Sequence, residues 1–290
     1  MIKYAVILSA GLGTRFLPFT KAIPKPMLPI IDTPTLEYII KEAIECGIPN
    51  IIVVIGHNAN VIEKHFQKIN NLNYDLLSKE IIEKLNFSDN VKLTFTKQFV
   101  LNGTAGAILS AKDIIGENDF LVMNADELFV KENICDKNAS KQLIDIYNRT
   151  GETIVGTQSI AKEDATRLGV VVGKRLDEKT IKLEKIVEKP SLNEIKEPIV
   201  NLGRYVVKSD IFTYLENVEA NKSGEYALTD ALVNYAKSHN VLCYEFVGKR
   251  YDIGNKFSFM KANFNFYLND KTYGKEFKDY VKDYLKNNYE

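Results

Sequence analysis

The chain has 290 residues, enough for a full hydrophobic core, and its 38 basic and 38 acidic side chains leave no formal net charge. Such a balance provides no field that attracts nucleic acids or acidic membrane surfaces, so we predict neither partner. The three cysteines are far apart, which argues against a disulfide framework, and no segment approaches the ~20 apolar residues of a membrane span, so we expect a cytoplasmic protein.

An apolar, β-branched run at residues 2–8 predicts a buried strand, and a loop with two glycines follows it. Gly11 and Gly13 allow the backbone to approach an anion closely, because neither carries a Cβ. Arg15 and Lys25 add cations that suit phosphate oxygens. Prolines on both sides of Lys25 predict an extended, stiff segment. The pattern predicts a phosphate-binding loop, and the alternative is a solvated basic loop.

A βαβ unit is predicted next. Residues 34–46 carry apolar side chains at helical spacing, and residues 51–55 form a second apolar run. A strand, a helix and a strand in this order predict parallel pairing with a right-handed crossover. Ligands of such sheets bind at the carboxyl ends of the strands, where the glycine loop already stands. We expect structural roles for His57, after the second strand, and for His65.

A second glycine-containing turn follows a third predicted strand at residues 91–95 and opens a helix of small residues at 107–111. Gln98 and Gly103 belong to this turn. A glutamine amide offers a ligand both a donor and an acceptor, and the start of a helix offers unpaired N–H groups. The turn therefore predicts a second part of a ligand site, and the alternative is a glycine that lets the helix pack closely on the sheet.

A fourth apolar run at residues 120–123 brings Asp126 and Glu127 to the same edge of the sheet. A carboxylate that faces a phosphate loop is suited to bind a hard divalent cation. Only one of two consecutive strand residues can point into a site, because successive side chains alternate between faces. The alternative for Asp126 is a turn or capping role.

The second half of the chain begins near residue 150, with strands predicted at residues 153–157 and 168–172. Gly169 would allow a ligand to approach the second of these strands closely. Glu188 and Lys189 combine an acceptor for hydroxyl hydrogens with a cation for a phosphate, and the proline that follows ends the strand and can turn both into one cavity. The alternative is an exposed surface pair.

Two helix starts are predicted near the C-terminal end. Residues 224–231 are similar to a helix start of a known family, and Thr229 is a suitable N-cap for it. Asp252 stands two residues before Gly254, whose turn opens the next amphipathic helix. A charged helical tail follows.

Five segments together resemble the sugar-1-phosphate nucleotidylyltransferases, and in detail the bacterial UTP:glucose-1-phosphate uridylyltransferases. The resemblance covers residues 2 to about 266 and is carried by AGLGTR at 10–15, TKAIPK at 20–25, KPMLP at 25–29, VEKP at 187–190 and GNK at 254–256. Pro26, where those enzymes usually have a glutamate, and the turn at 103–107 are closer to the wider superfamily.

This resemblance implies an α/β fold: a Rossmann-like three-layer nucleotidyltransferase with a mixed, mostly parallel central sheet. It implies one domain over residues 1–290, with a nucleotide-binding half at 1–150, a sugar-phosphate-binding half at 151–266 and a helical C-terminal tail at 267–290. It also suggests a homodimer or a homotetramer.

The resemblance also implies the role of each site residue. The catalytic residues would be Arg15, Lys25 and Lys189. The nucleotide would be bound by Ala10, Gly11, Gly13, Gln98 and Gly103. The sugar phosphate would be bound by Gly169, Glu188 and Lys189, and the cofactor Mg²⁺ by Asp126 and Asp252.

The implied reaction transfers uridylyl from UTP to glucose 1-phosphate, and both small molecules are the expected partners. Two alternatives stay open. The first is an enzyme of the same fold that uses dTTP, CTP or a different sugar. The second is a sugar-nucleotide sensor without activity, which would be expected to lack one of the metal aspartates or phosphate cations.

Overall fold

The computed structural model describes residues 1–56, 59–69, 72–133, 136–221 and 224–289. His57 lies outside these ranges, and so does Cys135, one of the three cysteines. Within the described chain, no helix combines the length and the apolar character needed to cross a membrane.

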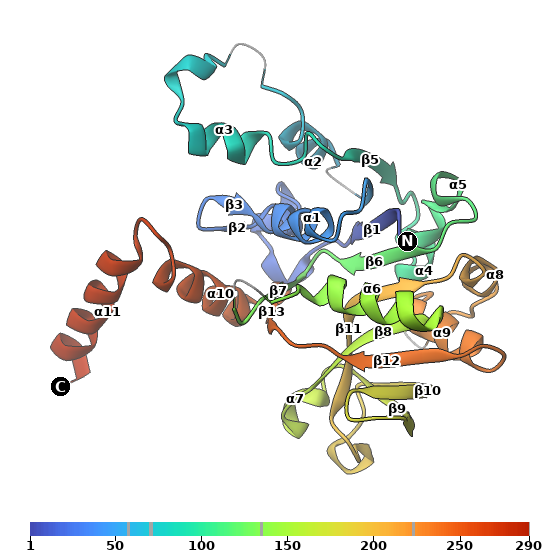
Figure 1. Ribbon diagram of the computed structural model, residues 1–290. Helices are drawn as coiled ribbons and strands as arrows, with labels where there is room; N and C mark the ends of the chain where they lie inside the picture. The colour runs from blue at the N-terminus through green and yellow to red at the C-terminus, as the bar shows by residue number, and fades with distance from the viewer. Residues whose placement is uncertain (57–58, 70–71, 134–135, 222–223, 290) are drawn as a thin grey trace.

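Nine strands form one central sheet in the order β5-β4-β1-β6-β11-β8-β12-β10-β9 (Figure 1). They are β1 (Tyr4–Ser9), β4 (Asn50–Ile55), β5 (Lys92–Lys97), β6 (Phe120–Asn124), β8 (Thr153–Ser159), β9 (Gly169–Arg175), β10 (Thr180–Glu188), β11 (Ile199–Val207) and β12 (Val241–Glu245). Two small sheets pair β2 (Pro29–Ile30) with β3 (Thr33–Pro34), and β7 (Glu127–Val130) with β13 (Lys249–Asp252). All six strands that were predicted by range are confirmed.

The central sheet is mixed, as predicted, and its parallel strands are concentrated in the first half of the chain. β1 is parallel to both β4 and β6, and β5 is parallel to β4, which confirms the βαβ unit. β11 runs antiparallel to β6 and β8, and β9 and β10 form an antiparallel hairpin. A short turn joins β9 to β10, and such a connection requires antiparallel strands. The parallel part carries the glycine loop.

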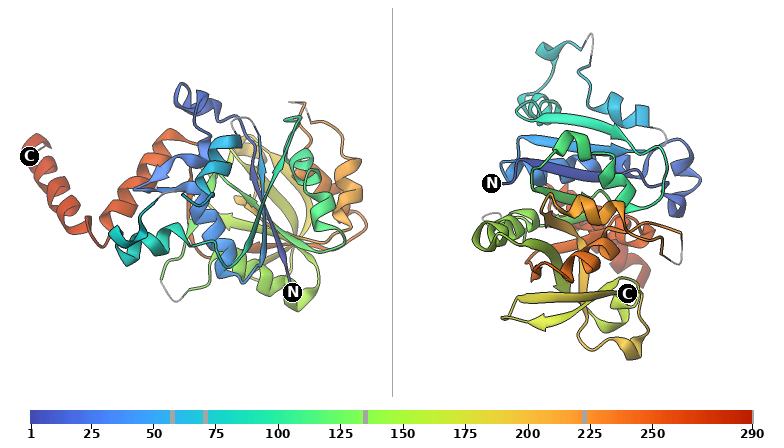
Figure 2. Two further views of the ribbon diagram at one scale, coloured as in Figure 1. Left: turned by 90° about the horizontal axis from the view of Figure 1, so that it is seen from above. Right: turned by 90° about the vertical axis from the view of Figure 1, so that its right-hand side faces the viewer.

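Helices cover both faces of the sheet and create the predicted three layers (Figure 2). One hydrophobic cluster packs α1, α2, α6 and α10 against one face, and a second cluster packs α4, α5, α8 and α9 against the other. Strand β1 contributes Ala5 and Ile7 to the first cluster and Val6 to the second, because successive strand side chains alternate.

The helices of these layers are α1 (Thr35–Glu45), α2 (Ala59–His65), α4 (Thr104–Leu109), α5 (Lys112–Ile115), α6 (Ala139–Thr150), α8 (Ile211–Glu216), α9 (Leu228–Ala236) and α10 (Lys256–Leu268). The short helix α7 (Lys162–Ala165) adds the buried Ala165 to the first cluster, and α3 (Lys79–Leu85) and α11 (Gly274–Tyr289) lie outside the layers. The tail helix α11 extends away from the body (Figure 1). Short 3₁₀ turns span Thr14–Phe16, Phe19–Lys21, Lys25–Met27, Tyr74–Leu76 and Leu192–Glu194.

Two local predictions were wrong. Lys25 does not lie in an extended segment but begins a 3₁₀ turn, because the fixed φ of Pro26 also suits such a turn. Thr229 is not the N-cap of α9, which is Ala227. The hydroxyl of Thr104, on α4, accepts from the N–H of Leu228 at 2.8 Å, so the first turn of α9 receives its side-chain acceptor from a different helix.

Candidate active site

Three residues from distant parts of the chain meet beyond the carboxyl end of β6. Asp126 lies between β6 and β7, and its carbonyl accepts from the N–H of Ile253 at 2.8 Å. This bond places Asp252, the last residue of β13, beside Asp126. The ammonium of Lys25 lies 2.7 Å from Oδ2 of Asp126. The fold therefore brings Lys25 close to both of the aspartates that were predicted to bind metal.

Gly254 faces the same space as these three side chains. A Cβ built on it would lie 3.0 Å from Oδ1 of Asp252, 3.2 Å from Oδ2 of Asp126 and 3.5 Å from Nζ of Lys25. The backbone N–H of Gly254 donates to Oδ1 of Asp252 at 2.8 Å, which fixes that carboxylate. The missing side chain thus leaves a cradle that both carboxylates line.

Lys25 favours the ionised form of the Asp126 carboxyl. Burial alone would raise the pKa of this carboxyl, but the charge and the hydrogen bond of Lys25 hold the pKa below its usual value of 3.8. Arg250 contributes in the same direction. Asp126 is therefore ionised at neutral pH, as a ligand for a divalent cation must be.

Two carboxylates are a suitable set for Mg²⁺, which usually takes one or two protein carboxylates together with phosphate oxygens and water. In the part of the chain that the structure describes, no group of three or more acidic, histidine or cysteine side chains is placed to hold a metal ion. The cradle fits a metal shared with a phosphate ligand, and does not fit a complete cage of protein ligands.

The glycine loop packs directly against Lys25. Gly13 has a φ of +64°, which a residue with a side chain adopts only with strain, and a Cβ on it would lie 2.9 Å from Cβ of Lys25. The hydroxyl of Thr20 donates to the carbonyl of Gly13 at 2.8 Å. Gly11 is exposed, with nothing within 4 Å of its Cβ position, whereas Ala10 is buried. Gly13 thus packs against Lys25 and Thr20, whereas the backbone at Gly11 is accessible to a ligand.

Arg15 is exposed in the 3₁₀ turn after this loop. No hydrogen bond or ion pair joins its guanidinium to any other described residue. Among the described residues, Arg15 therefore forms no hydrogen bond or ion pair with Lys25 or the aspartates.

The second glycine turn holds Gln98 in place. Gln98 is buried after β5, and its amide N–H groups donate to the carbonyl of Gly103 at 3.0 Å and to Oδ1 of Asn102 at 3.1 Å. A Cβ on Gly103, whose φ is +110°, would lie 2.4 Å from the carbonyl oxygen of Tyr226. Close backbone packing therefore explains the glycine at position 103. The amide oxygen Oε1 of Gln98 accepts no bond from the described chain.

Glu188 and Lys189, which were predicted to bind the sugar phosphate, lie at the end of β10 in the β9–β10 hairpin. The ammonium of Lys189 is 3.7 Å from Oε1 of Glu188, and both side chains are exposed. Lys189 has a φ of +46°, and this left-handed conformation brings two consecutive side chains together at the end of β10. Gly169 pairs with Glu188 across the hairpin, and a Cβ on Gly169 would lie 3.1 Å from Oε2 of Glu188.

Sequence reasoning assigned no role to Asn201, which lies on β11 beside Gly169. Its Oδ1 is buried and has no hydrogen-bond partner in the described chain. The only signal in the sequence is a polar residue within an apolar strand. Nearby, burial raises the pKa of Tyr205, and the charges of Glu127 and Glu188 add to the increase. Strand β11 also reaches Glu127, the residue after Asp126, through the backbone N–H of Gly203, so it contacts both parts of the candidate site.

His65 is placed as predicted, in a structural position. Its Nε2 lies 2.7 Å from Oε1 of Glu37, on α1.

Comparison with known proteins finds relatives over nearly the whole chain. The model of the nucleotidyl transferase family matches residues 4–269. A UTP–glucose-1-phosphate uridylyltransferase of Staphylococcus saprophyticus is 38% identical over 97% of this chain and 98% of its own. A UDP-glucose pyrophosphorylase solved with UDP-glucose is 32% identical, with a TM-score of 0.85 over 93% of this chain and 100% of its own. A UTP-bound enzyme of the same kind from Acinetobacter baumannii is 31% identical, with a TM-score of 0.87 over 97% and 99%.

Proposed function

The chain belongs to the nucleotidyl transferase family, and we propose that it transfers a uridylyl group from UTP to glucose 1-phosphate, releasing pyrophosphate and forming UDP-glucose. The observation that carries the proposal is the meeting of Lys25, Asp126 and Asp252 around the Gly254 cradle. This is one cation and two carboxylates at the strand end where the glycine loop begins. The relatives that bind UTP and UDP-glucose share nearly the whole chain.

Asp126 and Asp252 would hold Mg²⁺, which supplies positive charge to the phosphates of UTP when it is bound. Lys25 adds a fixed ammonium beside the same carboxylates. Arg15 is placed after the glycine loop, and its exposed guanidinium has no partner among the described residues, which leaves it able to meet the outer phosphates. The open backbone at Gly11 suits close approach of an anion.

Gln98 reads the base. Its two amide hydrogens are already used within the turn, so the oxygen Oε1 is the atom that faces a ligand. An acceptor in this position pairs with the N3–H of uracil, whereas cytosine carries an acceptor at N3. The turn therefore favours UTP over CTP, and discrimination against dTTP must come from other groups.

The sugar phosphate meets Glu188 and Lys189. Glu188 accepts hydrogens from sugar hydroxyls, Lys189 meets the phosphate, and the orphan Oδ1 of Asn201 supplies a further acceptor beside Gly169. A phosphate oxygen of glucose 1-phosphate attacks the α-phosphorus of UTP in line, and pyrophosphate leaves. No general base is required, because the attacking oxygen is already ionised; charge neutralisation and alignment provide the catalysis.

Three features of this proposal remain predictions: the division of the single domain at residues 150 and 266, the cytoplasmic location, and the assembly into a homodimer or a homotetramer. The continuous nine-stranded sheet supports one domain, because strands from both halves pair within it.

The test is pyrophosphate release with Mg²⁺ across UTP, dTTP, CTP, ATP and GTP, each with glucose, galactose or N-acetylglucosamine 1-phosphate. We expect the highest kcat/KM for UTP with glucose 1-phosphate, and a loss of about 100-fold or more in Asp252→Asn. Asp89→Asn makes the same chemical change at an exposed position and should retain full activity. A preference for another pair would support a different nucleotidylyltransferase, and silence with every pair would support the sensor.

A further inference from the structure

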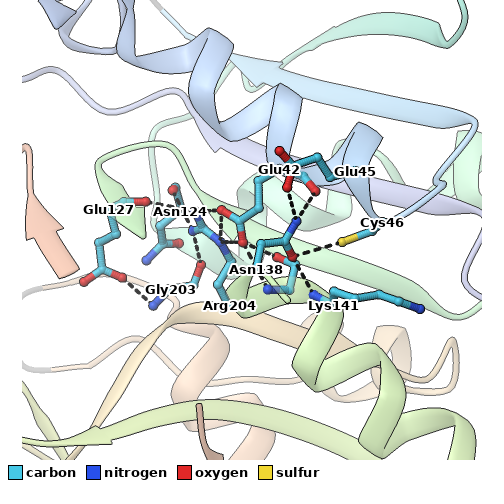
Figure 3. A network of polar contacts seen from close by, with 10 residues as sticks. Glu42, Glu45, Cys46, Asn124, Glu127, Asn138, Lys141, Gly203 and Arg204 are labelled. Carbon is cyan, nitrogen blue, oxygen red and sulfur yellow. Dashed lines mark hydrogen bonds and ion pairs between the residues drawn. The ribbon is translucent and has the colours of Figure 1, made fainter. Parts of the chain in front are cut away.

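A fully buried arginine lies beneath the turn that carries Asp126. Arg204, on β11, has an exposed fraction of 0% and forms a two-pronged ion pair with Glu42 of α1 (Figure 3). Its Nε lies 3.0 Å from Oε1 of Glu42, and its Nη2 lies 2.7 Å from Oε2. Glu42 also accepts from the N–H and the hydroxyl of Ser140, on α6. Glu42 thus neutralises the guanidinium of Arg204, and Ser140 holds the Glu42 carboxylate in place.

The remaining donors of Arg204 hold the backbone on both sides of Asp126. Nη1 donates to the carbonyl of Asn124 at 3.2 Å, and Nη2 donates to the carbonyl of Glu127 at 2.9 Å (Figure 3). These two carbonyls flank the Asn124–Glu127 turn, which presents the Asp126 carboxylate. A rigid guanidinium fork that binds both ends of a turn restricts the position of the side chain between them.

Glu127 extends this clamp to the strand that carries Asp252. One oxygen of its buried carboxylate accepts from the backbone N–H of Gly203, and the other accepts from both Nε and Nη2 of Arg250. Arg250 lies on β13, two residues before Asp252, and β13 pairs with β7 so that Asp252 faces Glu127. The Glu127–Arg250 pair therefore ties together the two segments that carry the aspartates.

We propose that Arg204, Glu127 and Arg250 are positioning residues, which set the separation of Asp126 and Asp252 so that both carboxylates engage one divalent cation. This inference rests on the proposed function, because it assigns the cradle to a metal. None of the three is assigned as a ligand of the substrate or the metal; each acts through the backbone or the strand that carries an aspartate.

The direction of the change in affinity for the divalent cation distinguishes a positioning role from a purely electrostatic one. Arg250 carries a positive charge close to the aspartates, so its removal would by electrostatics alone attract a divalent cation more strongly. Loss of positioning has the opposite result, because two misplaced carboxylates bind the cation less well. Removing Arg204 itself would leave the buried Glu42 carboxylate without a neutralising cation and endanger folding, so Arg250, which is partly exposed, is the residue to change.

The experiment measures Mn²⁺ binding with UTP present, from the loss of the free Mn²⁺ electron paramagnetic resonance signal beyond the loss that the same UTP causes without protein, together with thermal unfolding. The variants are Arg250→Met, Arg250→Lys and the control Lys249→Met, which removes the same charge from the neighbouring position of β13 without a bond to Glu127. We expect Mn²⁺ to bind about 10-fold more weakly in both Arg250 variants, because lysine keeps the charge but lacks the fork. The control should bind Mn²⁺ as the wild type does or slightly more tightly.

Folded Arg250→Met that binds Mn²⁺ as tightly as the wild type, or more tightly, would overturn the inference. Should Arg250→Met not fold, Arg250→Lys decides: weaker binding supports positioning, and unchanged binding overturns it. A double-mutant cycle with Glu127→Gln adds a second criterion, since residues that act through one contact give losses that do not add. If the wild type itself binds no Mn²⁺ with UTP, the proposed function fails, and not this inference alone.

Discussion

The two lysine–carboxylate pairs of the candidate site differ in their surroundings. Lys25 and Asp126 lie 2.7 Å apart, with side chains 16% and 38% exposed, whereas Lys189 and Glu188 lie 3.7 Å apart and are 64% and 63% exposed. Solvent screens charges strongly at an exposed pair and much less at a partly buried one. The first pair is therefore suited to stabilise charge in a transition state, and the second is suited to capture and orient a ligand.

The two pairs also differ in the contacts that hold their residues in place. Gly13 packs against Lys25, and backbone bonds tie Asp126 to Ile253 and to Arg204 through the flanking carbonyls. Lys189 is held by a backbone bond from its N–H to the carbonyl of Leu168. The comparison teaches that equal side-chain chemistry gives different function when packing differs, and the following predictions test it from the largest effect to the smallest.

Lys25→Ala should lower kcat by about 100-fold or more, a few kcal/mol of transition-state stabilisation, because it removes the fixed cation from the cradle. Pyrophosphate release at saturating UTP, glucose 1-phosphate and Mg²⁺ measures the loss. Lys92→Ala, at an exposed position of β5, is the control and should be near normal. A nearly normal kcat in Lys25→Ala would contradict the assignment.

Gly254→Ala should raise the Mg²⁺ concentration required for half-maximal rate by about 10-fold, because the new methyl group would lie 3.0–3.2 Å from both aspartate carboxylates. Titration of the rate with Mg²⁺ at fixed UTP gives this value. Thermal unfolding without Mg²⁺ should change little. An unchanged Mg²⁺ dependence would show that the metal lies elsewhere.

Lys189→Met should raise the KM for glucose 1-phosphate by about 10-fold and lower kcat much less, because an exposed cation contributes mainly to capture of the anion. Added salt should reduce the difference between variant and wild type by screening this charge. Lys185→Met, at an exposed position of β10 just before Lys189, is the matched control. A loss in kcat as large as that of Lys25→Ala would remove the distinction between the two pairs.

Outside both pairs, Glu37→Gln tests a structural carboxylate. Burial raises the pKa of Glu37, but the hydrogen bonds of His65 and Lys41 outweigh it and hold the pKa below the usual 4.5. The unfolded chain therefore takes up the proton first as the pH falls, so the stabilisation by Glu37 is complete above pH 4.5 and is lost below it. Urea unfolding should show Glu37→Gln less stable by about 1 kcal/mol at pH 7, with a difference that shrinks toward pH 3. A constant difference would contradict the prediction.

The sequence determined the framework of the fold. Apolar, β-branched runs became strands β1, β4 and β6 because their side chains must be buried on both faces of a sheet covered by helices. The polar residues that follow such runs therefore lie at one edge. That rule predicts Gln98 and Asp126 at the edge of the sheet that carries the glycine loop, and the family motifs add Asp252, whose strand is too short to be recognised from its pattern.

Tertiary structure decided the contacts between these elements. Thr104 supplies the acceptor at the start of α9 across 124 residues of chain, and Glu42 pairs with Arg204 across 162. Neither pairing leaves a local pattern, because each depends on the direction and register of strands far apart in the sequence. Periodicity reports whether a side chain is buried, and only the folded sheet determines which charge lies next to it; for this reason the clamp around Asp126 had no signal in the sequence, although each of its residues was present in it.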